Sequence, residues 1–369
     1  MRTADMLITI CFVPERDRLV RLGAAAAVAA AGAGASVLVQ RRHTRRIAED
    51  PERAVLEASL DGRPLTVTSS DGTELHVEVF GAEGAPTLVL VHGWTEALRY
   101  WTYVIRELSD QFRIVAYDLR GHGRSGRAAG DDYSLDRFGD DLEAVLDATV
   151  PRTEKAFVAG HSLGGMSIAA WAEHRSVSPR VGGAALMFTG IGGLVGGQLV
   201  VHVPRFAQAL AEPVARYAFL GARGSLPRIS TPVSYAAVRY ATFGADCTPA
   251  QVAFFERMLI ACPADVRRKA GIAMQDMDLY HALPRLTVPT LVMAGENDRL
   301  TPPTHARRIA EELPNLYELV VLPGTGHMGP LERPAAVSDA LRRLMADAGG
   351  GRSAPPSGQR RARTPARAN

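Results

Sequence analysis

The sequence predicts an α/β fold: a doubly wound, mostly parallel sheet with helices on both faces and an inserted helical cap. Two observations point to this fold. Short apolar runs, typical of buried parallel strands, alternate with stretches long enough to be helices. One connection, between about residues 190 and 283, contains no matching strand and is far too long to be a loop. We expect this connection to cover the carboxyl ends of the strands, where such sheets bind ligands.

The expected strands and helices follow in order along the chain. Two β runs, 65–69 and 73–80, are joined by Asp71-Gly72, which is typical of a hairpin turn. Six further strands are expected at 87–92, 113–118, 156–160, 181–188, 290–294 and 318–322. Helices are expected around 47–58 and at 97–108, 135–149, 163–175, 303–313 and 335–348.

These elements divide the 369 residues into six segments. They are a basic, Ala-rich segment (1–46), a linker (47–64), a first core part (65–189), the cap (190–283), a second core part (284–348) and a basic tail (349–369). The tail has no large apolar residue, so we expect it to be disordered.

Charge is distributed unevenly along the chain. The net charge is +3, but residues 1–46 and 349–369 each carry +5, which leaves −7 on the body between them. An acidic body argues against nucleic acid as a partner, because a nucleic-acid-binding domain presents a basic face to phosphates. The three cysteines cannot form a disulfide framework, and no Cys or His spacing is typical of zinc. We therefore expect no metal and no cofactor.

Residues 22–39 form an uncharged stretch bracketed by arginines, and three interpretations stay open. Its 18 residues fit the lower limit of a membrane span, although nine are Ala and three are Gly. The chain would then be membrane-associated through this single segment, with a slight excess of arginine after it that favours a cytoplasmic body. A cleaved signal peptide ending at Ala33-Gly34-Ala35 is a second interpretation. The third is a non-spanning Ala-rich helix or an over-extended start, in a soluble cytoplasmic protein.

The strongest catalytic motif is Gly160-His161-Ser162-Leu163-Gly164, a G-x-S-x-G pattern. It follows an expected strand and opens an expected helix, as a strained strand–turn–helix nucleophile requires. Ser162 is a weak nucleophile by itself and needs a base.

His327 and Asp298 are the expected partners of Ser162. Both follow expected strands, and strand ends of one parallel sheet converge, so the three side chains can meet. A carboxylate fixes the tautomer of such a histidine and stabilises its imidazolium. Glu296 rivals Asp298 for this role. His92-Gly93-Trp94 ends the first buried strand, and the backbone N–H groups of Trp94 and Leu163 would form an oxyanion hole.

The chain resembles the α/β-hydrolase superfamily, in its serine esterase or lipase-like branch, over residues 65–345. The resemblance rests on the following segments: LVLVHGW (88–94), YDLRGHGRSG (117–126), VAGHSLGG (158–165), PTLVMAGENDRLTPP (289–303) and LPGTGHMGPLERP (322–334). It implies Ser162 as nucleophile, His327 as base and Asp298 as acid. His92 and His161 are interpreted as structural, and Asp118 and His122 as turn and hydrogen-bonding residues.

The sequence thus predicts a serine carboxylic-ester hydrolase that acts on a lipophilic small-molecule or lipid ester through an acyl-enzyme. A cofactor-free haloperoxidase, perhydrolase or carbon–carbon bond hydrolase with the same triad is the alternative, although such enzymes usually have Met where Leu163 stands. A non-catalytic ligand-binding protein on this fold is a third hypothesis. The natural substrate and the oligomeric state are not predicted.

Overall fold

The computed structural model describes residues 36–194, 229–275 and 277–349. The chain divides into two compact units, residues 1–49 and 50–369. In the first unit, residues 36–48 are helical, and Val37, Leu38 and Val39 are each about half exposed. Most of the 22–39 stretch and nearly all of the tail lie outside the described residues. Among the helices that are described, none is both long and apolar enough to cross a membrane.

The second unit is built on an eight-stranded sheet in the order β1-β2-β4-β3-β5-β6-β7-β8. β1 and β2 pair antiparallel, as do β2 and β4, and every other pair is parallel. The strands are β1 Arg63–Thr68, β2 Glu74–Phe80, β3 Thr87–Val91, β4 Arg113–Tyr117, β5 Ala156–His161, β6 Val181–Met187, β7 Thr290–Gly295 and β8 Leu316–Leu322. All eight expected strands are therefore present, within a few residues of the predicted ends.

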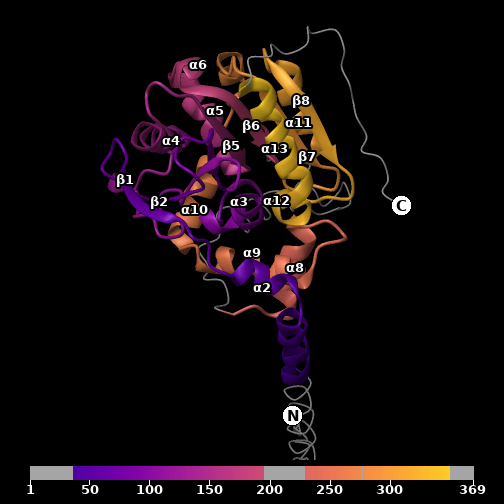
Figure 1. The fold of residues 1–369 in the computed structure, drawn as a ribbon. Helices are drawn as coiled ribbons and strands as arrows, with labels where there is room; N and C mark the ends of the chain where they lie inside the picture. Colours follow the sequence, from indigo (N-terminus) through magenta and orange to yellow (C-terminus); the bar gives the residue numbers. More distant parts are fainter. Residues whose placement is uncertain (1–35, 195–228, 276, 350–369) are drawn as a thin grey trace, which may run out of the picture. The chain divides into compact units, whose positions relative to one another are not determined.

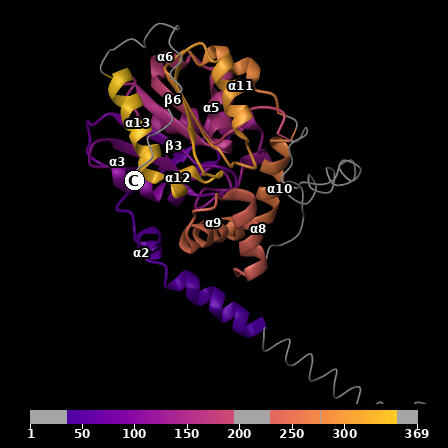
Figure 2. The same cartoon turned by 90° about the vertical axis from the view of Figure 1, so that its right-hand side faces the viewer.

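Helices cover both faces of this sheet (Figures 1 and 2). α3, α12 and α13 pack together on one side, α5 and α11 lie on the other, and α4 packs against α5. The described helices are α2 Glu52–Glu57, α3 Thr102–Leu108, α4 Leu135–Thr149, α5 Leu163–His174, α6 Val177–Arg180, α8 Pro232–Thr242, α9 Pro249–Ala261, α10 Ala264–Ala273, α11 Pro303–Glu312, α12 Gly329–Glu332 and α13 Pro334–Gly349, with short 3₁₀ helices η1 Leu98–Trp101, η2 Ala129–Asp131 and η3 Tyr280–Arg285.

The doubly wound, mostly parallel architecture is confirmed, and it follows from the burial of the strands. β3, β5 and β7 are buried at every position. Strands buried in this way must be apolar along their length and must be covered by helices on both faces of the sheet. Two predicted helices differ. Of the helix expected around 47–58, residues 49–51 are not helical and α2 spans only Glu52–Glu57, and the helix expected at 97–108 divides into η1 and α3. The Asp118 carboxylate accepts a hydrogen bond from Leu98 N–H at 2.6 Å, which fixes the 3₁₀ turn ahead of the α-helix.

Between β6 and β7 the described residues contain the helices α8, α9, α10 and η3 and no strand. α8 and α9 begin with capping boxes, Thr231 with Ser234 and Thr248 with Gln251, and both have Pro in the first turn. The end of α8 meets the loop after β8, where the Thr242 carbonyl accepts a hydrogen bond from His327 N–H at 2.7 Å. The Gln251 side chain of α9 donates to the Leu331 carbonyl of α12 at 2.8 Å. The cap helices therefore meet the same edge of the sheet that carries the predicted site.

Candidate active site

Ser162 lies at a sharp turn between β5 and α5, in the strained conformation that the motif predicts. Its backbone has φ 51° and ψ −116°, a combination that costs of order 1–3 kcal/mol in a residue with a side chain. The two flanking glycines allow the turn. A Cβ on Gly160 would come within 2.4 Å of Gly164, and one on Gly164 within 2.1 Å of the Val91 carbonyl. The strain is held by backbone contacts, since Ser162 N–H donates to the Met187 carbonyl at 3.0 Å.

Asp298 and His327, from the loops after β7 and β8, form a buried pair. The distance between His327 Nδ1 and Asp298 Oδ2 is 2.8 Å. The other carboxylate oxygen, Oδ1, accepts hydrogen bonds from the backbone N–H groups of Leu300 at 2.8 Å and Thr301 at 2.9 Å. The Thr301 hydroxyl donates to Oδ2 at 2.9 Å. These three donors fix the orientation of the carboxylate, and they satisfy the negative charge that the imidazole faces.

The surroundings of His327 favour its charged form. Burial alone would lower the pKa of His327, but the charge and hydrogen bond of Asp298, with smaller contributions from Glu96 and Glu332, raise it above its usual 6.5. A base that is buried and yet accepts a proton readily is what nucleophilic attack by a serine requires.

The loop that carries His327 is clamped on both sides. The Glu332 carboxylate accepts hydrogen bonds from Gly326 N–H at 3.1 Å and Met328 N–H at 3.2 Å, the two neighbours of His327. It also accepts one from Gly244 N–H, just after α8, at 2.8 Å. His327 N–H itself donates to the Thr242 carbonyl at 2.7 Å. The end of α8 is thus bonded directly to the histidine loop.

The loop that carries His327 contacts His161, the last residue of β5. The His161 Nε2 lies 2.9 Å from the His327 carbonyl oxygen, and the two imidazole rings are 4.9 Å apart between centroids. Because Ser162 follows His161 directly, the serine turn and the Asp298–His327 pair lie at one edge of the sheet.

The loop after β3 lies against the first turn of α5. Besides the close approach to Val91, a Cβ on Gly164 would stand 2.9 Å from the His92 carbonyl. Trp94 follows in this loop, and its indole Nε1 donates to the Arg267 carbonyl at 2.9 Å. The N–H of Leu163 opens α5 and has no carbonyl within the helix to bond, as for any first helical residue. Both predicted oxyanion donors thus belong to adjoining segments beside Ser162.

The other polar residues weighed from the sequence have structural contacts. His92 donates from Nδ1 to the Gly93 carbonyl and accepts from Leu119 N–H on Nε2, and burial lowers its pKa well below the usual value. Asp118 binds Leu98 N–H and Arg124 N–H. Glu296, the rival acid, accepts from Gly324 N–H at 3.0 Å, whereas the carboxylate on His327 is that of Asp298.

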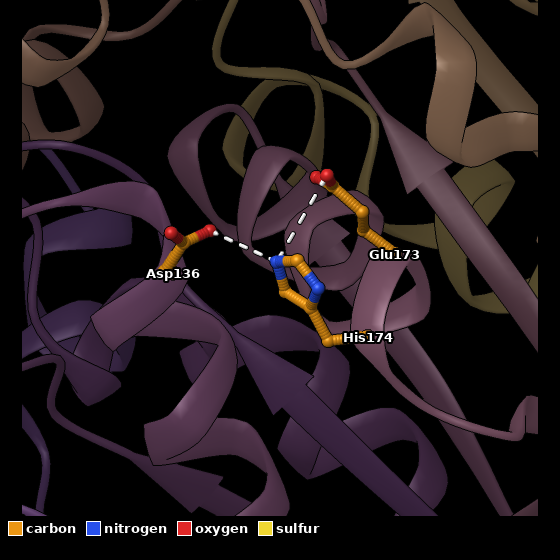
Figure 3. A group of neighbouring side chains, drawn as sticks. All are labelled: Asp136, Glu173 and His174. Carbon is orange, nitrogen blue, oxygen red and sulfur yellow. Dashed lines mark ion pairs between the residues drawn. The ribbon is translucent and has the colours of Figure 1, made fainter.

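A metal site was not expected, and the one group of suitable ligands among the described residues lies away from Ser162. Asp136, Glu173 and His174 gather at the surface, and both carboxylates face the same imidazole nitrogen, at 3.5 and 3.9 Å (Figure 3). His174 ends the helix that Ser162 precedes, about 18 Å along the axis. Exposed ion pairs account for this cluster.

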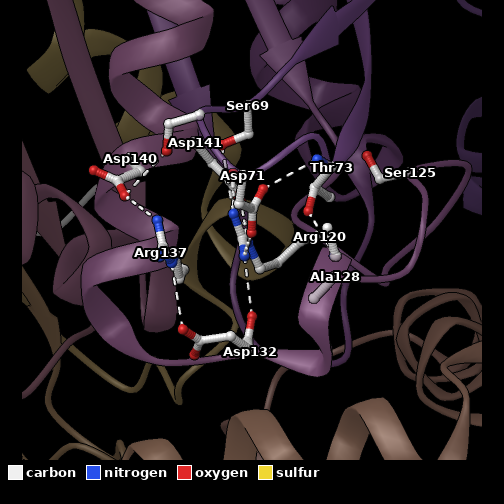
Figure 4. Close-up of polar contacts among 12 residues, drawn as sticks. Ser69, Asp71, Thr73, Arg120, Ser125, Ala128, Asp132, Arg137, Asp140 and Asp141 are labelled. Carbon is white, nitrogen blue, oxygen red and sulfur yellow. Dashed lines mark hydrogen bonds and ion pairs between the residues drawn. The ribbon is translucent and has the colours of Figure 1, made fainter.

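Sequence reasoning missed three residues that support the site, Glu96, Thr301 and Glu332, and a fourth, Arg120, that supports the fold around it. Arg120 is fully buried in the loop after β4 (Figure 4). Its guanidinium binds both oxygens of the buried Asp141 carboxylate, at 2.6 and 2.7 Å, and Asp71 of the β1–β2 turn at 2.8 Å. It thereby joins the hairpin, the β4 loop and α4. The many arginines and aspartates in this part of the sequence are consistent with such ion pairs, but the sequence does not specify which residues pair.

Comparison with known proteins agrees with this fold. The chain is 26% identical over 289 residues to 3-oxoadipate enol-lactonase 2 of Acinetobacter baylyi, which covers 76% of this chain and 96% of that protein. It is 25% identical over 289 residues to a bifunctional esterase/perhydrolase of Acinetobacter calcoaceticus, covering 74% and 97% respectively. A solved esterase from Rhodococcus sp. superposes with a TM-score of 0.58 at 25% identity, covering 78% of this chain and 99% of the esterase.

The profile of one protein family, described as the alpha/beta hydrolase fold, matches residues 86–334. That range includes the strained serine turn, the Asp298 loop and the His327 loop. The eight-stranded, mostly parallel sheet has the arrangement of that fold. The chain belongs to the alpha/beta hydrolase family.

Proposed function

We propose that this hydrolase is a serine carboxylic-ester hydrolase, with Ser162 as nucleophile, His327 as general base and Asp298 as the acid that orients it. Ser162 Oγ attacks the ester carbonyl carbon while its proton passes to His327 Nε2. The tetrahedral intermediate collapses, the proton moves to the departing alkoxide, and an acyl-enzyme and an alcohol result. Water, deprotonated by the same histidine, then attacks the acyl carbonyl and releases the carboxylic acid.

One observation carries this proposal: a serine in a strained strand–helix turn beside a buried Asp298–His327 pair whose members are 2.8 Å apart. The backbone N–H groups of Trp94 and Leu163 would stabilise the oxyanion. Each such donor contributes about 2.7–4 kcal/mol to a transition state of this kind. No cofactor is needed for these steps.

We assign a lipophilic ester as the substrate class, and residues 190–283 as the cap that selects it. The cap segment is rich in apolar side chains, and its described helices contact the strand-end loops through Thr242 and Arg267. Contact with a membrane through residues 22–39 stays a prediction, because most of that stretch lies outside the described residues.

The test is a series of p-nitrophenyl esters of increasing acyl length, assayed with the full-length protein and with Ser162→Ala. We expect hydrolysis that is strongest for medium or long chains, and a fall to background in the variant, by about 10⁶-fold. Activity unchanged in Ser162→Ala, or no ester hydrolysed at any length, would contradict the proposal.

The names of two relatives support a second candidate, in which the same triad acts on a lactone or uses peroxide. One is described as an enol-lactonase and the other as an esterase/perhydrolase. Leu163 after the serine disfavours the peroxide chemistry, as the sequence suggests. Halogenation that depends on hydrogen peroxide, measured with a dye substrate beside ester hydrolysis, separates the two.

A further inference from the structure

The Glu96 carboxylate and the His161 imidazole form a second buried acid–histidine pair next to Ser162. Their side chains are 1% and 0% exposed. His161 Nδ1 lies 3.0 Å from Glu96 Oε1 and 3.2 Å from Oε2. The Tyr100 ring packs against the imidazole at 4.6 Å between centroids, and Phe188 lies at 5.9 Å. The pair is therefore sealed from water, so its hydrogen bonds must be satisfied within the protein.

The hydrogen bonds of this pair require two protons, whereas a neutral histidine beside an ionised carboxylate carries only one. On one side of the ring, Nε2 faces the His327 carbonyl at 2.9 Å, and a carbonyl only accepts, so Nε2 must bear a hydrogen. On the other side, Nδ1 faces a carboxylate, which also only accepts when ionised. A hydrogen must lie between Nδ1 and Glu96 as well.

The location of this proton follows from the second partner of the Glu96 carboxylate. Its Oε2 also accepts a hydrogen bond from Gly93 N–H. A backbone donor on a carboxylate favours the ionised acid, which leaves the proton on His161. The pair is then an imidazolium and a carboxylate with no net charge. That neutrality matters because His327, 4.9 Å away between ring centroids, must itself become positive.

The pair joins the loop after β8, which carries His327, to the loop after β3, which carries Gly93 and Trp94. Through His161 it holds the backbone carbonyl of His327, and through Glu96 it holds the N–H of Gly93, the residue before Trp94. There is no spare room in this arrangement, since a Cβ on Gly93 would stand 2.9 Å from His161 Nδ1 and 3.0 Å from Glu96 Oε2.

We propose that Glu96 and His161 are positioning residues. They form an imidazolium–carboxylate pair that fixes the loop of His327 and the loop of Gly93 and Trp94 relative to Ser162. This inference rests on the proposed function for its kinetic consequence, but not for its protonation state. Tyr100, His92 and His327 are the other titratable groups that face the pair.

The first test is nitrogen-15 NMR of full-length protein labelled in histidine, at neutral pH, which detects protonation of each ring nitrogen without any substrate. We expect both nitrogens of His161 to be protonated in the wild-type protein. In Glu96→Gln the amide can donate to Nδ1 while its oxygen accepts from Gly93, so only Nε2 of His161 should remain protonated. An unprotonated Nδ1 in the wild-type protein would overturn the assignment.

The second test separates positioning from mere stability by comparing Glu96→Ala with Glu96→Gln. Displacement of catalytic groups by about 1 Å costs about 10²-fold in rate. We expect Glu96→Ala to lower kcat by about that factor with KM changed less than about threefold, and to shift the His327 ring signals. Glu96→Gln, which keeps every hydrogen bond, should stay within about fivefold of wild type and leave those signals in place.

Glu173→Ala is the matched control, because it removes a glutamate that pairs with a surface histidine, His281, at 2.9 Å. Its kcat should match the wild type. The proposal is overturned if Glu96→Ala, folded by circular dichroism, retains wild-type kcat and an unmoved His327 signal, or if Glu96→Gln loses as much as Glu96→Ala. If no ester is hydrolysed at all, the proposed function fails, while the nitrogen signals still decide the charge of the pair.

Discussion

Replacing Asp298 by asparagine should abolish most activity by trapping His327 in the wrong tautomer. The backbone N–H groups of Leu300 and Thr301 both point at Asp298 Oδ1, so the amide oxygen of an asparagine must occupy that position. The amide nitrogen then faces His327 Nδ1 and donates to it. A histidine that accepts at Nδ1 carries its hydrogen on Nε2, and Nε2 can no longer take the proton of Ser162. Such a tautomer change costs about 10⁴-fold in a serine triad, or about 5.5 kcal/mol in the transition state.

The assay is kcat/KM for the best p-nitrophenyl ester, measured for Asp298→Asn and for Glu296→Gln. Glu296→Gln is the control, because Glu296 is the rival carboxylate and its side-chain oxygen contacts only Gly324 N–H among the bonds described for it. We expect the control to stay within about threefold of wild type. Asp298→Asn within tenfold of wild type, or an equal loss in Glu296→Gln, would refute the assignment of the acid.

Three further predictions follow from the contacts of the site and its support. The pKa of His327 is raised above 6.5 and the base acts only when neutral, so kcat/KM should rise with pH, with its midpoint above 6.5; a midpoint near pH 5 would contradict this. Arg120→Met should lower the free energy of unfolding in urea by about 3–5 kcal/mol by stranding Asp141, and Arg120→Met/Asp141→Leu should recover most of the loss; an additive loss would argue against the pair. Gly164→Ala should lower that free energy by about 3 kcal/mol, because its Cβ would meet the Val91 carbonyl at 2.1 Å, and unchanged thermal unfolding would count against the close approach.

The elements that carry the chemistry could be predicted because their signals are local. The G-x-S-x-G motif, the apolar run before it and the helical stretch after it place Ser162 at a turn without any knowledge of the rest of the chain. Asp298 and His327 follow expected strands, and the convergence of parallel strand ends then places all three at one edge of the sheet.

The long-range supporting contacts could not be predicted, because the two partners lie far apart in the sequence. Glu332 binds Gly244, which is 88 positions earlier, and Glu96 meets His161 across 65 positions. Each contact joins a side chain to a group whose direction is set only after the sheet, the loops and the cap have assembled. The charge of Glu96 was visible in the sequence, but its burial against an imidazole was not.

The order of the strands is a similar case. The sequence predicts eight strands and a hairpin, but β4 lies between β2 and β3, and β2 pairs antiparallel with β4. Apolar runs of nearly equal length and burial do not distinguish their neighbours in a sheet, so the pattern predicts the architecture and leaves the pairing open.

The central claim is that Ser162 is an activated nucleophile, and covalent labelling tests it most directly. The folded full-length protein is incubated with a fluorophosphonate, its intact mass is measured, and the modified peptide is sequenced. We expect one adduct per chain, on Ser162, that is absent from Ser162→Ala and slowed about 10⁴-fold in Asp298→Asn. Folded protein that gains no adduct, or gains it on another residue, would contradict the account.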